Sequence, residues 1–187
     1  MSLPTTRRDY TGAPLLEASA GADPLEVFLS WYRAAETGEV DANAMALATV
    51  DGAGQPSVRI VLLKDVDERG LTFYTNYESR KGHDLAVNDH AAVVFYWRSI
   101  DRQVRVEGRV ERVAERESDA YFASRPRGSQ IGAWASAQSR VLTDRATLES
   151  KYESLQEGFG DAPVPRPQYW GGFRQLQSTC RRGRCCS

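Results

Sequence analysis

The sequence predicts a mainly β domain with flanking helices (α+β), built on an antiparallel sheet. Apolar, strand-like segments follow one another with only short turns between residues 44 and 76. A further segment, 103–113, alternates valine with charged side chains, as a half-solvated antiparallel strand does. Short connections between consecutive strands favour antiparallel pairing. The length of 187 residues and the hydrophobic content of 41% suit one compact domain.

Composition excludes several classes of function. The net charge of -1 gives no general attraction to nucleic acid or to an anionic membrane, so any anion site must be local. No apolar run approaches the roughly 20 residues that span a bilayer, and no signal peptide follows Arg7 and Arg8, so we expect a cytoplasmic protein. His83 and His90 lack zinc-ligand spacing, and three cysteines crowded near the C-terminus cannot form a closed disulfide framework. No metal site is expected.

The chain divides into three parts. Residues 1–22 are rich in small residues and are expected to form a mobile N-terminal arm. Residues 23–174 form the folded domain, which opens with a helix that Asp23 caps and Pro24 begins. Residues 175–187 shift abruptly to arginine and cysteine without alternation, and are expected to form a disordered tail.

The stretch Arg59–Lys64 is the centre of the prediction. Its four consecutive large apolar residues suit a strand that is covered on both faces. Arg59 and Lys64 are five residues apart, so an ideal strand points them to opposite faces, unless a bulge relaxes this. Two interpretations follow: a core strand whose terminal charges reach solvent, or an anion site at a strand end.

Two further segments favour the anion site. Ser79 is a candidate N-cap for a short helix whose first turn carries Arg80 and Lys81. Cations oppose the helix dipole there, which is unfavourable unless an anion binds, although a solvated pair remains an alternative. The segment 124–134 contains two arginines and two serines, and its Pro and Gly residues predict a loop suited to phosphate. A charged helix over 143–157 and a strand starting at Tyr169 follow.

Six motifs in this order resemble one family. They are RIVLLK, FYTN followed by SRKG, RQVRVEG, YFASRPRGSQIGAW, QSR and WGGFR. From Arg7 to about Arg174 the sequence resembles the pyridoxine/pyridoxamine 5′-phosphate oxidases. The resemblance implies an antiparallel FMN-binding split β-barrel that works as a homodimer with shared active sites.

The resemblance also implies site residues. Those matching FMN-contacting positions are Arg59, Ile60, Val61, Leu62, Leu63, Lys64, Tyr74, Thr75, Arg80, Lys81, Gln103, Gln138 and Ser139. Those matching substrate-binding positions are Arg7, Arg8, Asp9, Tyr10, Lys64, Tyr121, Arg125 and Ser129. In the family, the dimer partner supplies some of the FMN contacts. No side chain is an obvious general base, which is consistent with catalysis by orientation.

The implied reaction oxidises pyridoxine 5′-phosphate or pyridoxamine 5′-phosphate to pyridoxal 5′-phosphate, with dioxygen as electron acceptor and hydrogen peroxide as product. Two alternatives stay open. One is a related split-barrel flavoprotein with another substrate, such as a phenazine precursor. The other is a catalytically impaired flavin- or pyridoxal-phosphate-binding protein. A catalytically impaired protein is an alternative because the family's later motifs, EFWQG and RLHDR, do not occur after Arg174 in this sequence.

Overall fold

The computed structural model describes residues 14–16, 21 and 23–176. Within them, six strands close into a barrel in the order β1-β2-β3-β6-β5-β4, and every neighbouring pair is antiparallel. The strands are β1 (Ala44–Val50), β2 (Pro56–Asp67), β3 (Gly70–Asn76), β4 (His90–Trp97), β5 (Arg102–Arg112) and β6 (Trp170–Leu176). The predicted fold class, a mainly β antiparallel barrel with flanking helices, is confirmed.

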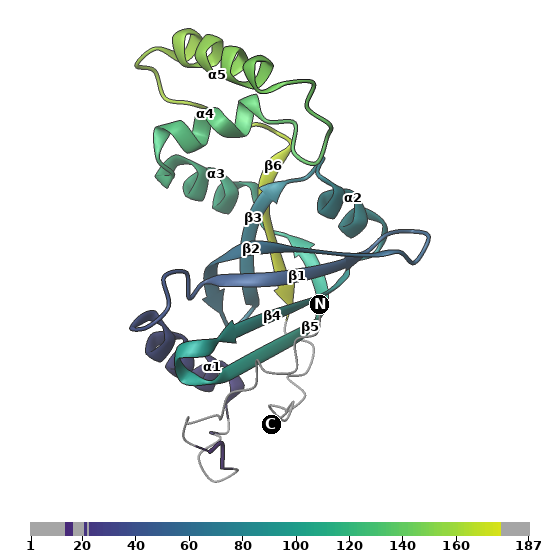
Figure 1. The fold of residues 1–187 in the computed structure, drawn as a ribbon, viewed down its shortest axis with the longest axis vertical. Helices are drawn as coiled ribbons and strands as arrows, with labels where there is room; N and C mark the ends of the chain where they lie inside the picture. The colour runs from purple at the N-terminus through teal and green to yellow at the C-terminus, as the bar shows by residue number, and fades with distance from the viewer. Residues whose placement is uncertain (1–13, 17–20, 22, 177–187) are drawn as a thin grey trace, which may run out of the picture.

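Five α-helices flank the barrel in the described residues. They are α1 (Pro24–Glu36), α2 (Arg80–Val87), α3 (Glu115–Ser124), α4 (Arg127–Ala135) and α5 (Arg145–Phe159), with a short 3-10 helix, η2, at Arg98–Ile100. Helices α3, α4 and α5 are layered beyond one end of the barrel, and α1 lies near the other end (Figure 1). The caps follow the sequence signals, since Asp23 accepts a hydrogen bond from the Leu25 N–H and Asp144 from the Thr147 N–H.

The barrel interior is the main hydrophobic core. Side chains of β1 alternate between buried and half-buried positions, which directs Met45 and Leu47 inward. Phe73, Phe95 and Trp97 fill the centre, and Phe28 of α1 packs onto the last two rings. A second, smaller cluster joins α3 and α4 to β6 through Phe122, Ile131, Val164 and Trp170. The two clusters hold the helical layer and the barrel in one unit.

Strand β2 differs from its predicted environment. Its outward side chains Val58, Ile60 and Leu62 are 69%, 65% and 40% exposed, so the strand is covered on one face and not on both. The expectation of a strand covered on both faces is therefore wrong for the single chain. The apolar run does not distinguish coverage by this chain from coverage by another molecule, because both would favour the same residues.

Two other predictions need correction. Residues 127–135 form helix α4 and not a loop, because Pro126 stands at the N-cap position, where the missing N–H costs nothing. Strand β6 continues through Gln175 and Leu176, two residues into the predicted tail. Gln175 is fully buried, and its Nε2 donates to the carbonyls of Ala91 and Val106, which explains how a polar residue is accommodated in this strand. Residues 177–187 and most of the predicted arm lie outside the described residues.

Candidate functional site

A cleft of about 1010 Å³ opens along the outer face of β2 and reaches α2 on one side and α3 and α4 on the other. Its size is in the range of pockets that hold cofactors or drug-sized ligands. Apolar side chains of β2 form one wall, and cations gather in two separate groups. The lining residues that carry charge or hydrogen-bonding side chains are Ser57, Arg59, Lys64, Tyr74, Thr75, Asn76, Arg80, Lys81, Tyr121, Ser124, Arg125, Ser129, Ser136, Gln138 and Ser139.

The first group of cations lies at the N-terminus of α2. Ser79 caps this helix by accepting a hydrogen bond from the Gly82 N–H. Lys81 is only 7% exposed. Its Nζ donates to Thr75 Oγ1 (3.0 Å), Ser79 Oγ (3.2 Å) and Gln138 Oε1 (2.9 Å). All three acceptors are neutral, so this buried ammonium has hydrogen-bond partners that do not balance its charge.

Burial changes the acidity of Lys81. Removal from water disfavours the ammonium, and the Arg59 charge adds to this, which together lower the pKa of Lys81 to about 8. Asp84 acts in the opposite direction. A phosphate dianion at this place would supply the missing negative charge, and the free N–H groups of the first helical turn would point at it.

Helix α2 lies too close to the preceding turn to allow a side chain at Gly82. A Cβ added there would lie 2.0 Å from the backbone carbonyl oxygen of Tyr77. The Ser79 hydroxyl also donates to the Asn76 carbonyl at 2.6 Å, which fixes the turn between β3 and the helix. This close approach explains the glycine after Arg80-Lys81 and holds Lys81 against β3.

Arg59 and Lys64 both line the cleft, although they are an odd number of residues apart. The pairing of β2 with β3 shifts between Leu63 and Asp65, so Lys64 occupies an irregular position. Such a bulge re-aims a side chain at a sheet edge. Arg59 reaches the site from the inward-facing series of β2, where Nη1 donates to the Leu47 carbonyl at 3.1 Å.

The second group of polar residues is built on aromatic rings. The ring centroids of Tyr74 and Tyr121 are 4.0 Å apart, and Trp170 lies 5.6 Å from Tyr74 and 6.1 Å from Tyr121. The three rings are nearly parallel, with interplanar angles of 17°, 11° and 6°. The Arg125 guanidinium lies 4.6 Å from the Trp170 centroid, and burial lowers its pKa. Its Nη1 is buried without a hydrogen-bond partner among the described residues.

This second group can therefore take an anion as well. A buried guanidinium nitrogen without a partner costs free energy unless a ligand or water satisfies it. Ser129 lies in the first turn of α4 and faces the same cleft. The Gln130 side chain donates to the carbonyls of Phe122 and Ala123, which ties the start of α4 to the end of α3.

Comparison with known proteins identifies the family. A family model described as Pyridoxamine 5'-phosphate oxidase matches residues 34–157. The pyridoxine/pyridoxamine 5'-phosphate oxidase of Cupriavidus taiwanensis is 56% identical over 90% of this chain and 79% of its own length. That of Ralstonia pickettii is 56% identical over 94% and 82%. The chain belongs to the pyridoxamine 5′-phosphate oxidase family.

Solved structures agree with this assignment to the pyridoxamine 5′-phosphate oxidase family. PhzG from Burkholderia lata, in complex with tetrahydrophenazine-1-carboxylic acid, superposes with a TM-score of 0.82 at 29% identity, over 90% of this chain and 84% of that one. A pyridoxamine 5'-phosphate oxidase-related, FMN binding protein from Nostoc punctiforme has a TM-score of 0.67 at 15% identity, over 84% and 82%. The second comparison supports the fold alone.

Most of the residues predicted from the sequence as site residues come together in the cleft. They are Arg59, Ile60, Val61, Leu62, Lys64, Tyr74, Thr75, Arg80, Lys81, Tyr121, Arg125, Ser129, Gln138 and Ser139. Leu63 instead points into the barrel core at 6% exposure. Gln103 does not line the cleft; it pairs with Tyr96 on the neighbouring strand. Arg7, Arg8, Asp9 and Tyr10 lie outside the described residues.

Sequence reasoning did not single out three residues in or behind the cleft. Trp170 lines the cleft between Tyr74 and Arg125, whereas the sequence indicated only the start of a strand. Thr49 and Asp84 lie behind Arg59 and are both buried. A lone acid in a short helix and a threonine in a strand carry no pattern that would single them out. No cluster of His, Cys, Asp or Glu in the described residues could hold a metal ion, and no described helix is long and apolar enough to cross a membrane.

Proposed function

We propose that the protein is an FMN-dependent oxidase that converts pyridoxine 5′-phosphate or pyridoxamine 5′-phosphate to pyridoxal 5′-phosphate. The observation that carries this proposal is one cleft with two separate phosphate-type sites. Lys81 and Arg80 stand at the start of α2, and Arg125 and Ser129 stand at the junction of α3 and α4. A phosphorylated cofactor beside a phosphorylated substrate requires such a pair of sites. The names of the relatives support the same substrates.

The residues present fit FMN. Lys81 has three neutral partners and lacks a balancing charge among them, which a phosphate would provide. The apolar wall of β2 offers the outward side chains Ile60 and Leu62 to a flat ring system. Bound FMN would supply the two-electron acceptor and would pass the electrons on to dioxygen.

The chain's own residues would bind the substrate and orient it. Arg125 and Ser129 would hold the substrate phosphate by charge-assisted hydrogen bonds. Tyr121 and Tyr74, stacked at 4.0 Å, would bound the space for the pyridine ring. Lys64 lines the same cleft and would add positive charge where negative charge develops on reduction. The contribution of the protein is then mainly the orientation of the reacting carbon.

The proposed reaction balances for both substrates. Pyridoxine 5′-phosphate loses two hydrogens, as a hydride and a proton, and dioxygen takes them up as hydrogen peroxide. With pyridoxamine 5′-phosphate, the same oxidation gives an imine, and water then releases ammonia and pyridoxal 5′-phosphate.

We also propose a homodimer whose partner completes each site. The outer faces of β1, β2 and β4 carry apolar side chains, among them Ile60 at 65% and Tyr96 at 58% exposure. The cleft opens onto this face, because Val58, Ile60 and Leu62 belong to both. A second copy seated there would cover these side chains and would let its own Gln103 reach the neighbouring cleft.

Two other functions are kept as candidates. The similarity to PhzG favours a related flavoprotein that oxidises a phenazine precursor, since a carboxylate would also satisfy Arg125. A binding protein without turnover is the third candidate. The unpartnered, buried Nη1 of Arg125 together with Ser129 favours a phosphate over a carboxylate, because three terminal oxygens can engage both side chains.

One assay separates these functions. The purified protein is incubated with FMN, and its flavin absorbance is recorded after gel filtration. Peroxide and pyridoxal 5′-phosphate are then measured with each phosphorylated substrate, and with a reduced phenazine carboxylic acid as the competing substrate. Retained flavin with turnover of the phosphorylated substrates supports the proposal. Turnover of the phenazine substrate alone would replace the proposed function with that of a phenazine-oxidising flavoprotein. Retained flavin without turnover of any substrate would indicate a binding protein.

A further inference from the structure

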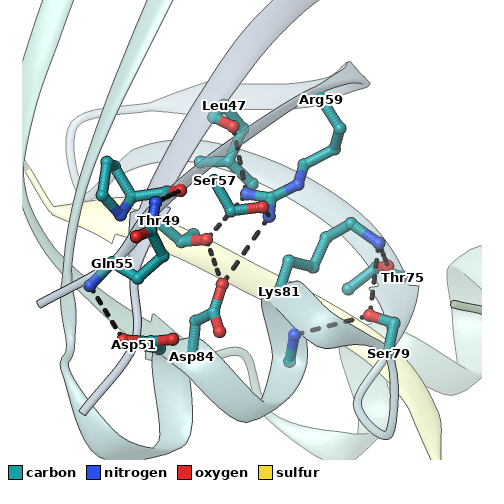
Figure 2. A network of polar contacts seen from close by, with 12 residues as sticks. Leu47, Thr49, Asp51, Gln55, Ser57, Arg59, Thr75, Ser79, Lys81 and Asp84 are labelled. Atoms are coloured by element: carbon teal, nitrogen blue, oxygen red, sulfur yellow. Dashed lines mark hydrogen bonds and ion pairs between the residues drawn. The ribbon is translucent and has the colours of Figure 1, made fainter. Parts of the chain in front are cut away.

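Asp84 is a buried acid to which the proposed reaction gives no part. It lies on α2 and is 4% exposed. Its Oδ2 accepts a hydrogen bond from Thr49 Oγ1 at 2.6 Å and lies 3.6 Å from Arg59 Nη2 (Figure 2). A carboxylate is rarely buried without a charged partner, so its position behind a cleft-lining arginine needs an explanation.

The contacts around Asp84 fix the Arg59 guanidinium from several sides. Arg59 Nη1 donates to Thr49 Oγ1 at 2.7 Å, and Nη2 donates to Ser57 Oγ at 2.6 Å. Thr49 therefore accepts from Arg59 and donates to Asp84, which closes a ring of three side chains (Figure 2). The planar fork of an arginine loses little freedom when it is held in this way before a ligand arrives.

Asp84 also acts electrostatically on Lys81, which is on the same helix and directs its Nζ toward Thr75 and Ser79. The charges that act on Lys81 are Arg59 from β2 and Asp84 from α2, and Arg80 in turn acts on Arg59. The neighbouring strands β1 and β3 present the neutral Thr49 and Thr75. Asp84 is thus the carboxylate that opposes the mutual repulsion of these cations, and it favours the charged form of Lys81.

We infer that Asp84 is a positioning residue for the cofactor phosphate: it orients Arg59 and keeps Lys81 protonated in the absence of ligand. The inference rests on the proposed binding of FMN at the start of α2. Removing one partner of a buried ion pair leaves the other charge uncompensated. With Asp84→Asn, Arg59 loses its ion pair, and Lys81 loses the charge that favours its ammonium.

The test compares FMN with riboflavin, which lacks the phosphate. Dissociation constants are measured by quenching of flavin fluorescence between about pH 6 and 10 for the wild type, Asp84→Asn and Asp89→Asn. Asp89 is the matched control, because it follows the same helix but pairs on the surface with Arg109 and His90. Thermal unfolding of each protein without ligand reports folding separately.

In the wild type, FMN binding should weaken as the pH rises through about 8, where Lys81 loses its proton. In Asp84→Asn the midpoint should lie at lower pH, and at pH values well above both midpoints the FMN dissociation constant should be roughly tenfold higher than that of the wild type, which corresponds to a midpoint shift of one pKa unit. Riboflavin affinity should not change, and Asp89→Asn should behave as the wild type.

Each other outcome overturns a different statement. A wild type that does not bind FMN would overturn the proposed function. A wild-type pH profile in Asp84→Asn, or equal weakening of FMN and riboflavin, would overturn the positioning role alone. If Asp84→Asn does not fold, Thr49→Val removes the shared hydroxyl and keeps both charges. In Thr49→Val the FMN dissociation constant should rise several-fold, and the midpoint of its pH dependence should stay near pH 8. An unchanged FMN affinity would overturn the inference.

Discussion

Arg125 combines two unusual surroundings in one side chain. Its guanidinium stacks on Trp170 at 4.6 Å, while its buried Nη1 has no hydrogen-bond partner among the described residues. This contact holds the guanidinium against the ring, and the unpartnered nitrogen leaves a donor for a ligand. A residue arranged in this way is suited to bind an anion that arrives and leaves during turnover.

Arg125→Ala should raise the KM for the phosphorylated substrate roughly 30-fold, because a charge-assisted hydrogen bond contributes about 1.5–3 kcal/mol. FMN affinity should stay within about twofold, since the cofactor phosphate is assigned to the other group of cations. Arg127→Ala is the control: this exposed neighbour donates to the carbonyls of Gly160 and Ala162 and not into the cleft. Equal loss of FMN in Arg125→Ala would show that the two phosphate sites are exchanged.

Lys81 makes the stability of the ligand-free protein depend on pH. Its pKa is about 8 in the folded protein and has an ordinary value of 10.5, so between these values the unfolded chain binds more protons. The free energy of unfolding should therefore rise with pH across this window through Lys81. Below about pH 8 both states are protonated, and the folded state carries the full cost of the buried charge.

Urea unfolding of the wild type and of Lys81→Met at several pH values checks this sign. The difference in unfolding free energy, wild type minus variant, should increase between about pH 8 and 10.5. Titrations elsewhere in the chain cancel in this difference. A difference that stays constant would mean that Lys81 keeps an ordinary pKa, and a difference that decreases would mean that its pKa is raised on folding.

At the scale of secondary structure, the start of β6 links strand β3 to helix α3 at the cleft. Trp170 contacts Tyr74 of β3 and Tyr121 and Phe122 of α3. The main chain of Trp170 is held as well, because its carbonyl accepts from Arg166 Nη1 at 2.7 Å. A shift of this strand would therefore move Arg125 and Tyr74 together.

Trp170→Leu keeps an apolar side chain but removes the ring beneath Arg125. The KM for substrate should rise about tenfold, as expected for a desolvated cation–π contact of about 1–2 kcal/mol, and Trp170→Phe should be intermediate. The matched control is Trp134→Leu, which removes an indole from the same helical layer whose Nε1 donates to the Pro165 carbonyl at 2.8 Å. That control should lose stability without a change in KM, and the same KM in both leucine variants would contradict the positioning role.

Sequence patterns predicted those elements whose signals are local. Ser79 and Asp23 mark helix starts by capping, and the strands around 44–76 are separated by turn residues. Helix α4 was missed because Pro126 and two glycines were interpreted as loop residues, whereas the proline stands just before the helix. The irregular position of Lys64 depends on the pairing of β2 with β3, which no residue type encodes. Asp84 acquires its role only when α2 is packed against β1 and β2.

At the scale of the whole molecule, the family assignment accounts for the cleft but the single chain leaves one face apolar and exposed. Alanine, valine and isoleucine of β1, β2 and β4 share this face by strand register. The sequence predicted that Ile60 is buried, whereas it is 65% exposed in the single chain. The proposed dimer would cover it, and an apolar run in the sequence does not distinguish coverage by this chain from coverage by a second copy.

Ile60→Lys should convert the proposed dimer to a monomer, because a charge at the centre of an apolar interface costs at least about 2–3 kcal/mol. Val141→Lys is the control, since Val141 is fully exposed and belongs to the segment between α4 and α5 and not to the strands that form this face. Sedimentation velocity at several protein concentrations measures the effect. An unchanged dimer in Ile60→Lys would place the interface elsewhere. A monomeric wild type would overturn the proposal that the protein is a homodimer.

Barrel closure also limits how the protein associates. Each described strand has a hydrogen-bonded neighbour on both sides, including β6, which pairs with β3 and β5. No described strand is therefore free along one whole edge, although residues 56–62 of β2 pair only with β1 and residues 102–109 of β5 pair only with β4. Contact through the exposed apolar side chains is face to face and ends once that face is covered. The same exposed surface on an open sheet would favour fibrils, whereas on this closed ring it favours a particle of finite size.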